Sequence, residues 1–305
     1  MTKARGSKNL PVKSDARILM CSPEHFAVDY AINPWMDPAD WAQKSKSLGL
    51  RARREWQGLR RRILSLGATV EEVPAVAGLP DLVFTANAAV VMDGIALVAR
   101  FRHPERQREE QHFERDFRKL WARGLLAGVR TMPDDILLEG AGDCVWDQAR
   151  QMFWMGYGPR SDRDAAAVVS ETFGIETIAL ELADPRFYHM DTAISALPRG
   201  EILYVPSAFT EAGTKEIFDR TTAEQRIALE PADAAVFVAN AVHIGDDIIM
   251  SHCSDSLRER LEGAGYRVHA TPLGAFHKSG GSAFCLTLRL DHKSERGSVA
   301  QRAAS

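Results

Sequence analysis

One order of segments recurs along this chain of 305 residues, and it limits the fold more than any other feature. In four places two short apolar stretches flank a turn, which is the pattern of a β-hairpin. Asp93-Gly94, Gly200 and Gly245-Asp246 mark three of these turns. The four predicted hairpins are residues 88–101, 144–157, 193–209 and 241–253.

Helical patterns alternate with the hairpins. Several of them open with Ser or Pro and end near Gly, as helices commonly do. The five predicted helices are residues 38–66, 104–125, 161–173, 211–228 and 254–263. Each leads into a short β-branched or apolar run that is typical of a strand, at residues 68–73, 128–132, 175–180, 234–239 and 266–271. A fifth hairpin is predicted between residues 282–290 and the N-terminal strand 16–21.

A single unit of this kind cannot bury its apolar face, so repeated units stack or close around an axis. We therefore predict an α/β fold, a five-bladed propeller with pseudo-fivefold symmetry and ββαβ repeats around a central active site. Residues 16–291 are predicted to form one domain. Residues 1–15 are basic and polar and residues 292–305 are polar and small, and both are predicted to be flexible tails.

The composition excludes several classes of protein. With 45% apolar and 26% charged residues the chain has the material for a substantial core. The net charge of −3 gives no reason to expect nucleic acid, and the basic run 51–62 is expected on the solvent face of a helix. No stretch resembles a signal peptide or a membrane span, so we expect a cytoplasmic protein without a membrane partner. A homo-oligomer is compatible with this composition.

The cysteines favour neither disulfides nor a metal. They lie far apart and form no CxxC pair, at Cys21, Cys144, Cys253 and Cys285. His252-Cys253 and the acidic turn 245–247 have no helical His spacing and no carboxylate cluster around them. We therefore predict four free thiols and no metal.

Polar residues gather where one unit passes into the next hairpin. In a closed ring these equivalent segments converge on the axis, so residues far apart in the chain would meet. A thiol, an imidazole, carboxylates and a carboxamide together are the inventory of a nucleophilic site. The residues concerned are Phe84, Asn87, Glu139, Asp143, His189, Asp191, Asn240 and Cys285.

Each of these residues also has a purely structural interpretation. A cysteine in an apolar run such as 284–288 is usually a small buried hydrophobe. Gly280-Gly281 just before it favours a close approach of the backbone to a ligand. His189 alone could be structural, and Glu139 and Asp143 could be turn and cap residues. The group as a whole favours Cys285 as nucleophile with His189 as general acid and base.

At two motifs the chain resembles the guanidine-modifying superfamily of arginine deiminases, amidinotransferases and dimethylarginine dimethylaminohydrolases. The motifs are His189-x-Asp191-Thr192 and Gly280-Gly281-x-x-x-Cys285, and the similarity runs from about Arg17 to Leu290. The resemblance implies the five-bladed "pentein" fold. It also implies that Cys285 is the nucleophile and His189 the catalytic histidine.

The same resemblance implies the substrate contacts. Glu139 and Asp191 would hold the guanidine group. Arg160, in the segment 156–161, matches an arginine that holds the substrate α-carboxylate in dimethylargininases, and Arg106 matches another such arginine less closely. Asp143 is counted with these substrate-binding candidates.

One departure points to a subgroup. Where deiminases and dimethylargininases carry an acidic residue, this chain has Phe84-Thr85-Ala86-Asn87. That form, with Asn33 in the stretch 32–36, is most similar to the arginine dihydrolases, which convert arginine to ornithine, ammonia and carbon dioxide. Phe84, Asn87 and Asn33 are therefore added to the predicted substrate site.

The chemistry explains the residue types. Carboxylates hold a planar guanidinium through charge-assisted hydrogen bonds, and its carbon is attacked by a thiolate. The result is an S-alkylthiouronium intermediate that needs no metal or organic cofactor. After the first round a neutral ureido group remains. Asn87 removes a charge and adds an N–H donor for that group, so the leading hypothesis is an arginine dihydrolase.

Three alternatives stay open at this point. A dimethylarginine dimethylaminohydrolase would release citrulline and dimethylamine. Simple deimination or amidino transfer would use the same residues. A non-catalytic pentein that only binds a partner belongs to a different class, and it would have no use for Cys285, His189 and Glu139 together.

Overall fold

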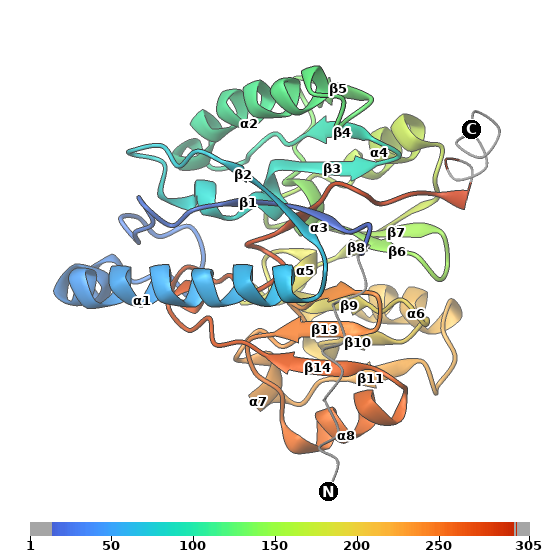
Figure 1. The fold of residues 1–305 in the computed structure, drawn as a ribbon. Helices are drawn as coiled ribbons and strands as arrows, with labels where there is room; N and C mark the ends of the chain where they lie inside the picture. The colour runs from blue at the N-terminus through green and yellow to red at the C-terminus, as the bar shows by residue number, and fades with distance from the viewer. Residues whose placement is uncertain (1–13, 296, 298–305) are drawn as a thin grey trace, which may run out of the picture.

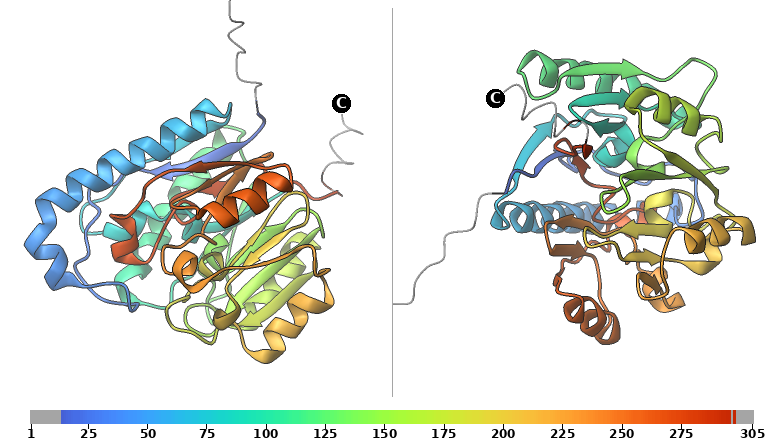
Figure 2. Two further views of the ribbon diagram at one scale, coloured as in Figure 1. Left: turned by 90° about the horizontal axis from the view of Figure 1, so that it is seen from below. Right: turned by 90° about the vertical axis from the view of Figure 1, so that its right-hand side faces the viewer.

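A computed structural model describes residues 14–295 and 297. Five three-stranded sheets are arranged around a central axis, with the longer helices around the outside (Figures 1 and 2). In every sheet the first two strands of the blade pair antiparallel and the last two pair parallel. The predicted five-bladed α/β propeller is thereby confirmed.

Four blades are each formed by one continuous stretch of the chain. The remaining, joining blade combines the last strand of the chain with its first two strands. The joining sheet has the order β15-β1-β2 and contains Leu288–Arg289, Arg17–Cys21 and Thr69–Val73. The next two are β3-β4-β5 (Ala89–Met92, Ile95–Val98, Gly128–Thr131) and β6-β7-β8 (Cys144–Asp147, Met152–Tyr157, Thr177–Glu181). The last two are β9-β10-β11 (Ile194–Ala196, Ile202–Tyr204, Arg226–Ala228) and β12-β13-β14 (Val242–Ile244, Asp247–Met250, Arg267–Ala270).

In each blade one longer helix connects the second strand to the third. In the joining blade this helix is α1, between β1 and β2. These helices are α1 (Pro38–Ser65), α2 (Pro104–Ala122), α4 (Ala165–Phe173), α6 (Glu211–Asp219) and α8 (Asp255–Gly263). α1 begins after Asp37, whose side chain accepts a hydrogen bond from the backbone N–H of Asp40, with Pro38 at the first helical position. Its apolar stripe, which includes Trp41, Trp56 and Ile63, is buried.

Local turn chemistry accounts for the hairpins. At the β3–β4 turn Asp93 and Gly94 have φ values of 52° and 79°. Two successive positive φ values characterise the type I′ turn, whose twist matches that of antiparallel strands. This turn sets the register that pairs Met92 with Ile95.

The fourth blade differs from the prediction. The helix expected at residues 211–228 ends at Asp219, and the third strand is β11, not residues 234–239. Ala234 ends the short helix α7 (Pro231–Ala234), and residues 235–239 form a turn after it. Pro231 starts α7 because its fixed φ suits the first helical position. The run of β-branched and aromatic residues that predicted a strand belongs instead to a buried turn.

The tails fall almost entirely outside the described residues. Residues 1–13 and 298–305 lie outside them. Of the predicted C-terminal tail, His292 accepts a hydrogen bond from the backbone of Asp93, and Ser294 donates its hydroxyl to the Asp93 carboxylate at 2.7 Å. The packed part of the chain therefore continues to Ser294. Within the part of the chain that the structure describes, none of the helices combines the length and apolar character needed to cross a membrane.

Candidate active site

Short segments that precede the first strand of each blade meet near the axis. Four of them are η2 (Thr85–Ala88) before β3, α3 (Gly140–Asp143) before β6, α5 (Met190–Ala193) before β9 and the turn 235–241 before β12. α3 packs against both η2 and α5. The fifth segment, residues 280–287, leads into β15 and carries Cys285.

Cys285 is buried between a carboxylate and a carboxamide. Its Sγ donates to Asp191 Oδ2 at 3.1 Å and accepts from Asn240 Nδ2 at 3.1 Å. Burial and the neighbouring Asp191 carboxylate raise the pKa of the Cys285 thiol well above its ordinary value. Burial also raises the pKa of Asp191, to about 7. With no cation bound, sulfur and carboxylate therefore hold a proton between them.

A second cluster is built on Glu139. Its Oε2 lies 2.8 Å from His189 Nε2 and accepts from Arg160 Nη1 at 2.9 Å, and Oε1 accepts from the backbone of Arg102 at 3.2 Å. Burial alone would raise the pKa of Glu139, but Arg160 and the hydrogen bond to His189 hold it well below its ordinary range. Burial lowers the pKa of His189 to about 4. Glu139 is thus a permanent anion beside a neutral imidazole.

Asp143 is engaged entirely by the protein. Oδ2 accepts from the Ser161 hydroxyl at 2.6 Å, and Oδ1 accepts from the backbone N–H of Met190 at 3.0 Å. Ser161 Oγ in turn accepts from the backbone N–H of Glu139. Asp143 therefore ties the segment of Glu139 to that of His189, and its predicted role in substrate binding stays a prediction.

Asn87 faces Arg106 on one side and α3 on the other. Its Oδ1 accepts from Arg106 Nη1 at 2.9 Å, and its Nδ2 donates to the Glu139 carbonyl at 3.4 Å. A Cβ placed on Gly142 would lie 2.1 Å from Asn87 Nδ2 and 3.6 Å from His189 Nδ1. Only glycine leaves room at this position, so the loop chemistry of 139–143 brings the amide close to the imidazole.

The two arginines occupy different surroundings. Arg106 is held by both oxygens of Glu109, at 3.0 and 2.8 Å, besides Asn87. Arg160 reaches Glu139, donates to the Ile32 carbonyl at 3.0 Å and lies 4.6 Å from the centre of the Tyr188 ring. Arg160 is therefore part of the Glu139 cluster, whereas Arg106 positions Asn87.

Asn33 and Phe84 lie against the segment before the nucleophile. Asn33 Nδ2 donates to the Ser279 carbonyl at 3.1 Å, and its Oδ1 caps the backbone N–H of Trp35. The Phe84 ring would lie 2.5 Å from a Cβ on Gly281. Both side chains shape the segment that leads to Cys285.

Three buried polar atoms in this region have no hydrogen-bond partner among the described residues. They are His189 Nδ1, Asp191 Oδ1 and Ser282 Oγ. Buried groups of this kind are uncommon in native proteins and gather where a ligand binds. The arrangement therefore suits a small polar ligand with several donors.

Sequence reasoning missed two further residues. Asp81 is buried and accepts from Tyr30 at 2.9 Å and from Ser279 Oγ at 3.1 Å. It stands in the same polar segment as Asn87, which could have drawn attention to it. Asn240 was noticed in its segment but given no role, because a lone Asn before a strand is common turn chemistry.

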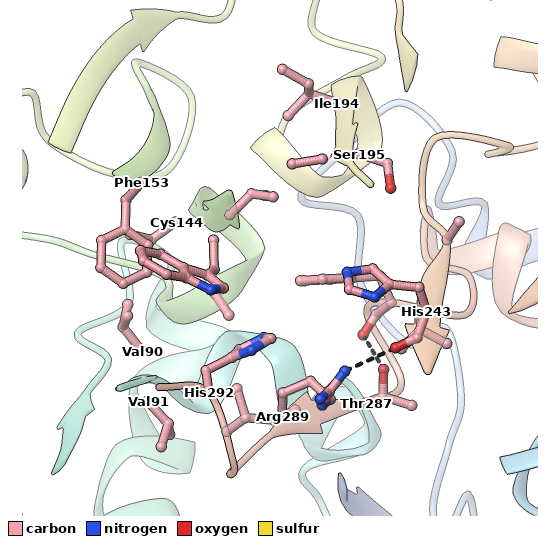
Figure 3. Close-up of a pocket in the computed structure, with 18 residues that line it drawn as sticks. Val90, Val91, Cys144, Phe153, Ile194, Ser195, His243, Thr287, Arg289 and His292 are labelled. Carbon is pink, nitrogen blue, oxygen red and sulfur yellow. Dashed lines mark hydrogen bonds between the residues drawn. The ribbon is translucent and has the colours of Figure 1, made fainter. Parts of the chain in front are cut away.

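An apolar cavity of about 40 Å³ lies along the first strands of the blades (Figure 3). Val90, Phe153 and Ile194 line it, together with His243, Arg289 and His292. Cys144, not Cys285, is the thiol on its wall. None of the ten predicted site residues lines this cavity, so it is separate from the polar cluster.

Metal-ligating groups are not assembled within the described part of the chain. No three His, Cys, Asp or Glu side chains there are arranged to hold a metal ion.

The fold and the cluster define the class. Five ββαβ blades that bring a thiol, an imidazole and carboxylates to the axis are those of a pentein-type guanidine-modifying protein, which confirms the resemblance. The chain belongs to the family described as "N,N dimethylarginine dimethylhydrolase, eukaryotic", whose model matches residues 22–291.

Two relatives with named activities are similar to most of this chain. The bifunctional arginine dihydrolase/ornithine cyclodeaminase AgrE of Nostoc sp. is 43% identical over 277 residues, which cover 91% of this chain and 38% of AgrE. The chain thus spans well under half the length of that relative. The N(G),N(G)-dimethylarginine dimethylaminohydrolase of Mycobacterium tuberculosis is 35% identical, with 90% of this chain and 85% of the relative covered.

Solved structures agree with the fold. The N-terminal domain of the cyanobacterial arginine dihydrolase ArgZ, as a Cys-to-Ser mutant bound to its substrate, superposes with a TM-score of 0.84 at 40% identity. The match covers 92% of this chain and 99% of that domain. An Asn-to-Ser mutant of the same domain, covalently bound to a reaction intermediate, gives the same TM-score.

Proposed function

We propose that this protein is an arginine dihydrolase, a cysteine hydrolase that converts free arginine to ornithine, ammonia and carbon dioxide. The observation that carries the proposal is the pairing of Cys285 with Asp191, beside a permanently charged Glu139 and a neutral amide at Asn87. The relatives with 40% identity or more and with known activities are named as arginine dihydrolases, which supports the same choice.

The resting site is poised to exchange a proton for a cation. When a guanidinium binds, its N–H groups can take the place of the Cys285 S–H at Asp191 and occupy the unpartnered Asp191 Oδ1. The nearby positive charge favours the thiolate. We propose that the thiol proton passes to His189, whose Nδ1 has no partner within the described residues.

The first round then follows from ordinary amidine chemistry. The Cys285 thiolate forms a bond to the guanidinium carbon, and the resulting adduct loses ammonia as His189 returns the proton to the leaving nitrogen. Water, deprotonated by His189, attacks the planar S-alkylthiouronium and breaks the C–S bond. The product is citrulline, with its neutral ureido group still in the site.

Asn87 distinguishes the second round. A site lined wholly by carboxylates favours a cation over a neutral ureido group. The Asn87 amide carries no charge, and its Nδ2 has a second N–H besides the one that meets the Glu139 carbonyl. Retention of the ureido group allows a second attack, which releases ammonia and carbon dioxide and leaves ornithine. Two waters are consumed in all.

The substrate's amino-acid end requires partners as well. We propose Arg160 for the α-carboxylate, since its guanidinium lies beside the cluster and over Tyr188. The predicted role of Arg106 in carboxylate binding stays a prediction, because its donors are taken up by Glu109 and Asn87. For the α-ammonium group we propose buried Asp81, which accepts from Ser279 Oγ in the segment that leads to Cys285.

Product analysis tests the proposal. Purified protein incubated with arginine should yield ornithine, two equivalents of ammonia and carbon dioxide, with citrulline appearing only transiently. Citrulline that accumulates without ornithine would contradict the dihydrolase assignment while leaving guanidine hydrolysis intact.

Dimethylarginine hydrolysis is the second candidate. It is favoured by the family model and by the mycobacterial relative, 85% of which the match covers. Parallel assays with arginine, asymmetric dimethylarginine and citrulline separate the two. Release of dimethylamine at a higher kcat/KM than release of ammonia from arginine would select this alternative. The single catalytic domain of residues 16–291, the cytoplasmic location and the homo-oligomer stay predictions.

A further inference from the structure

The carboxamide of Asn240 contacts Cys285 at two points. Nδ2 donates to Sγ at 3.1 Å, and Oδ1 accepts from the Cys285 backbone N–H at 3.1 Å. Nδ2 also donates to the Asp191 carbonyl at 3.2 Å. Asn240 is completely buried, and each of these contacts reaches the nucleophile or Asp191, which accepts the hydrogen bond from its S–H.

The turn that carries Asn240 is held in an unfavourable backbone conformation. Phe237 has a φ of 56°, which is rare for a bulky side chain. Its carbonyl accepts from the Asn240 N–H at 3.1 Å, and its ring packs 4.6 Å from Trp35 and 5.2 Å from His277. Strain held in place by packing, three residues before the residue that contacts the sulfur, indicates that the turn is shaped to position Asn240.

We infer that Asn240 is a further catalytic residue: its Nδ2 hydrogen bond stabilises the Cys285 sulfur as a thiolate, and its Oδ1 fixes the backbone of that residue. The inference rests on the proposed function only in taking Cys285 as the nucleophile. Hydrogen bonds to charged acceptors are about twice as strong as those between neutral groups. The bond therefore stabilises the thiolate more than the thiol.

Asn240 and Asp191 act on the sulfur in opposite directions. Asp191 accepts the S–H and favours the thiol, whereas Asn240 is a donor that cannot take up the proton. When a cation displaces the S–H from Asp191, the Asn240 bond remains and becomes charge-assisted. An Asp in place of Asn240 would reverse this effect, because a second carboxylate would repel the thiolate.

The Asn240 hydrogen bond should change the alkylation rate of Cys285 in a way that depends on pH. A stabilised thiolate is more abundant but intrinsically less nucleophilic, with a Brønsted slope of about 0.4–0.5. Below the pKa of the thiol the gain in abundance exceeds the loss in nucleophilicity. Above it, only the loss remains. Removal of the bond should therefore slow alkylation at neutral pH and not slow it at high pH.

The test measures the thiol and not arginine turnover. Thiolate absorbance in the ultraviolet and iodoacetamide alkylation of Cys285, followed by mass spectrometry, are recorded against pH for Asn240→Ala and Asn240→Asp. Each titration is referred to the same variant carrying Cys285→Ala. In Asn240→Ala, alkylation at neutral pH should fall about 4- to 20-fold, the midpoint should move to higher pH, and the limiting rate at high pH should be preserved or raised.

Ser251→Ala is the matched control. Ser251 Oγ donates to the Val236 carbonyl at 2.7 Å, so this variant loses a hydrogen bond to the same turn without touching the sulfur. Its midpoint should stay at the wild-type value. A midpoint that is unchanged in both Asn240 variants, or moved equally by Ser251→Ala, would overturn the inference.

Two features keep this test independent of folding and of substrate identity. Asn240→Asp keeps the shape of the side chain and the acceptor for the Cys285 N–H, so it reports on the combined loss of the donor and gain of a charge beside the sulfur even if Asn240→Ala is too unstable. It should raise the midpoint more than Asn240→Ala does, because it also adds a negative charge. If arginine is not turned over but the midpoints move as stated, the proposed function fails while the role of Asn240 stands.

Discussion

The polar cluster around Cys285 and the cavity of Figure 3 are both buried near the axis, yet ionisable groups differ in charge between them. In the cluster Glu139 remains an anion because Arg160 and His189 contact it. In the cavity burial lowers the pKa of both His243 and His292 to about 3, so both stay neutral. The side chains that contact a buried group, more than the extent of its burial, decide whether that group is charged.

The contrast extends to two carboxylates within the cluster itself. Glu139 and Asp191 are both almost fully buried, but the pKa of Glu139 is lowered and that of Asp191 is raised to about 7. Glu139 has an arginine beside it, whereas Asp191 has a thiol and an amide. One carboxylate is thus permanently charged, and the other is available for a cation that arrives with the substrate.

The largest expected effect distinguishes two of the four buried thiols, Cys285 in the cluster and Cys144 on the cavity wall. Cys285→Ser should lower the release of ammonia from arginine by about 10³-fold or more, because a hydroxyl is a much weaker nucleophile at neutral pH. Cys144→Ala, on the cavity wall, is the matched control and should keep activity within about twofold of the wild type. Rates comparable in both variants would remove the distinction between the two regions.

Asn87→Asp should change the product more than the first step. The added carboxylate favours the guanidinium and disfavours the neutral ureido group, so citrulline should accumulate and the ornithine-to-citrulline ratio should fall about 10-fold or more. Amino-acid analysis of a time course measures this ratio. An unchanged ratio would mean that Asn87 does not decide whether the ureido group is retained.

Replacement of the two carboxylates by their amides should change stability in opposite directions. Glu139→Gln leaves Arg160 and His189 without an anionic partner and should lower the Tm by several degrees. The pKa of Asp191 is raised from 3.8 to about 7, so the folded state binds the extra proton and loses stability as pH rises through that range. Asp191→Asn removes this loss and should raise the Tm above neutral pH.

Thermal unfolding of both variants across pH measures this difference. Asp247→Asn is the control, because that carboxylate pairs with His269 at 2.7 Å outside the cluster. A Tm that falls equally in Glu139→Gln and Asp191→Asn would show that the two carboxylates do not differ as their contacts indicate.

The smallest effect is expected in the cavity. The pKa of His243 falls from 6.5 to about 3 on folding, so the unfolded state takes up the proton first and stability is lost as pH drops below 6.5. His243→Leu should leave the kcat for arginine close to wild type and reduce the acid-induced loss of Tm by a few degrees, since one pKa unit corresponds to about 1.4 kcal/mol. A loss of activity in His243→Leu would instead show that the cavity contributes to catalysis.

Much of the fold was predictable because its signals are local. Asp93-Gly94 requires two positive φ values and so specifies a tight hairpin, and Pro38 and Pro104 mark the starts of α1 and α2. The prediction was wrong in the blade of β11. There a β-branched and aromatic run forms the strained turn at Phe237, and tertiary packing overrides the intrinsic strand preference.

The residues themselves determined which segments meet at the axis. A ring of five like units brings its connecting loops together, so Cys285, His189 and Glu139 could be grouped from the sequence. The charge states, the use of Arg106 to hold Asn87 and the two contacts of Asn240 with Cys285 were decided only by the tertiary structure. The reason is the separation along the chain over which each effect acts. Turn and helix signals act over a few residues, whereas a buried pKa depends on partners such as Glu139 and His189, which lie 50 positions apart in the chain.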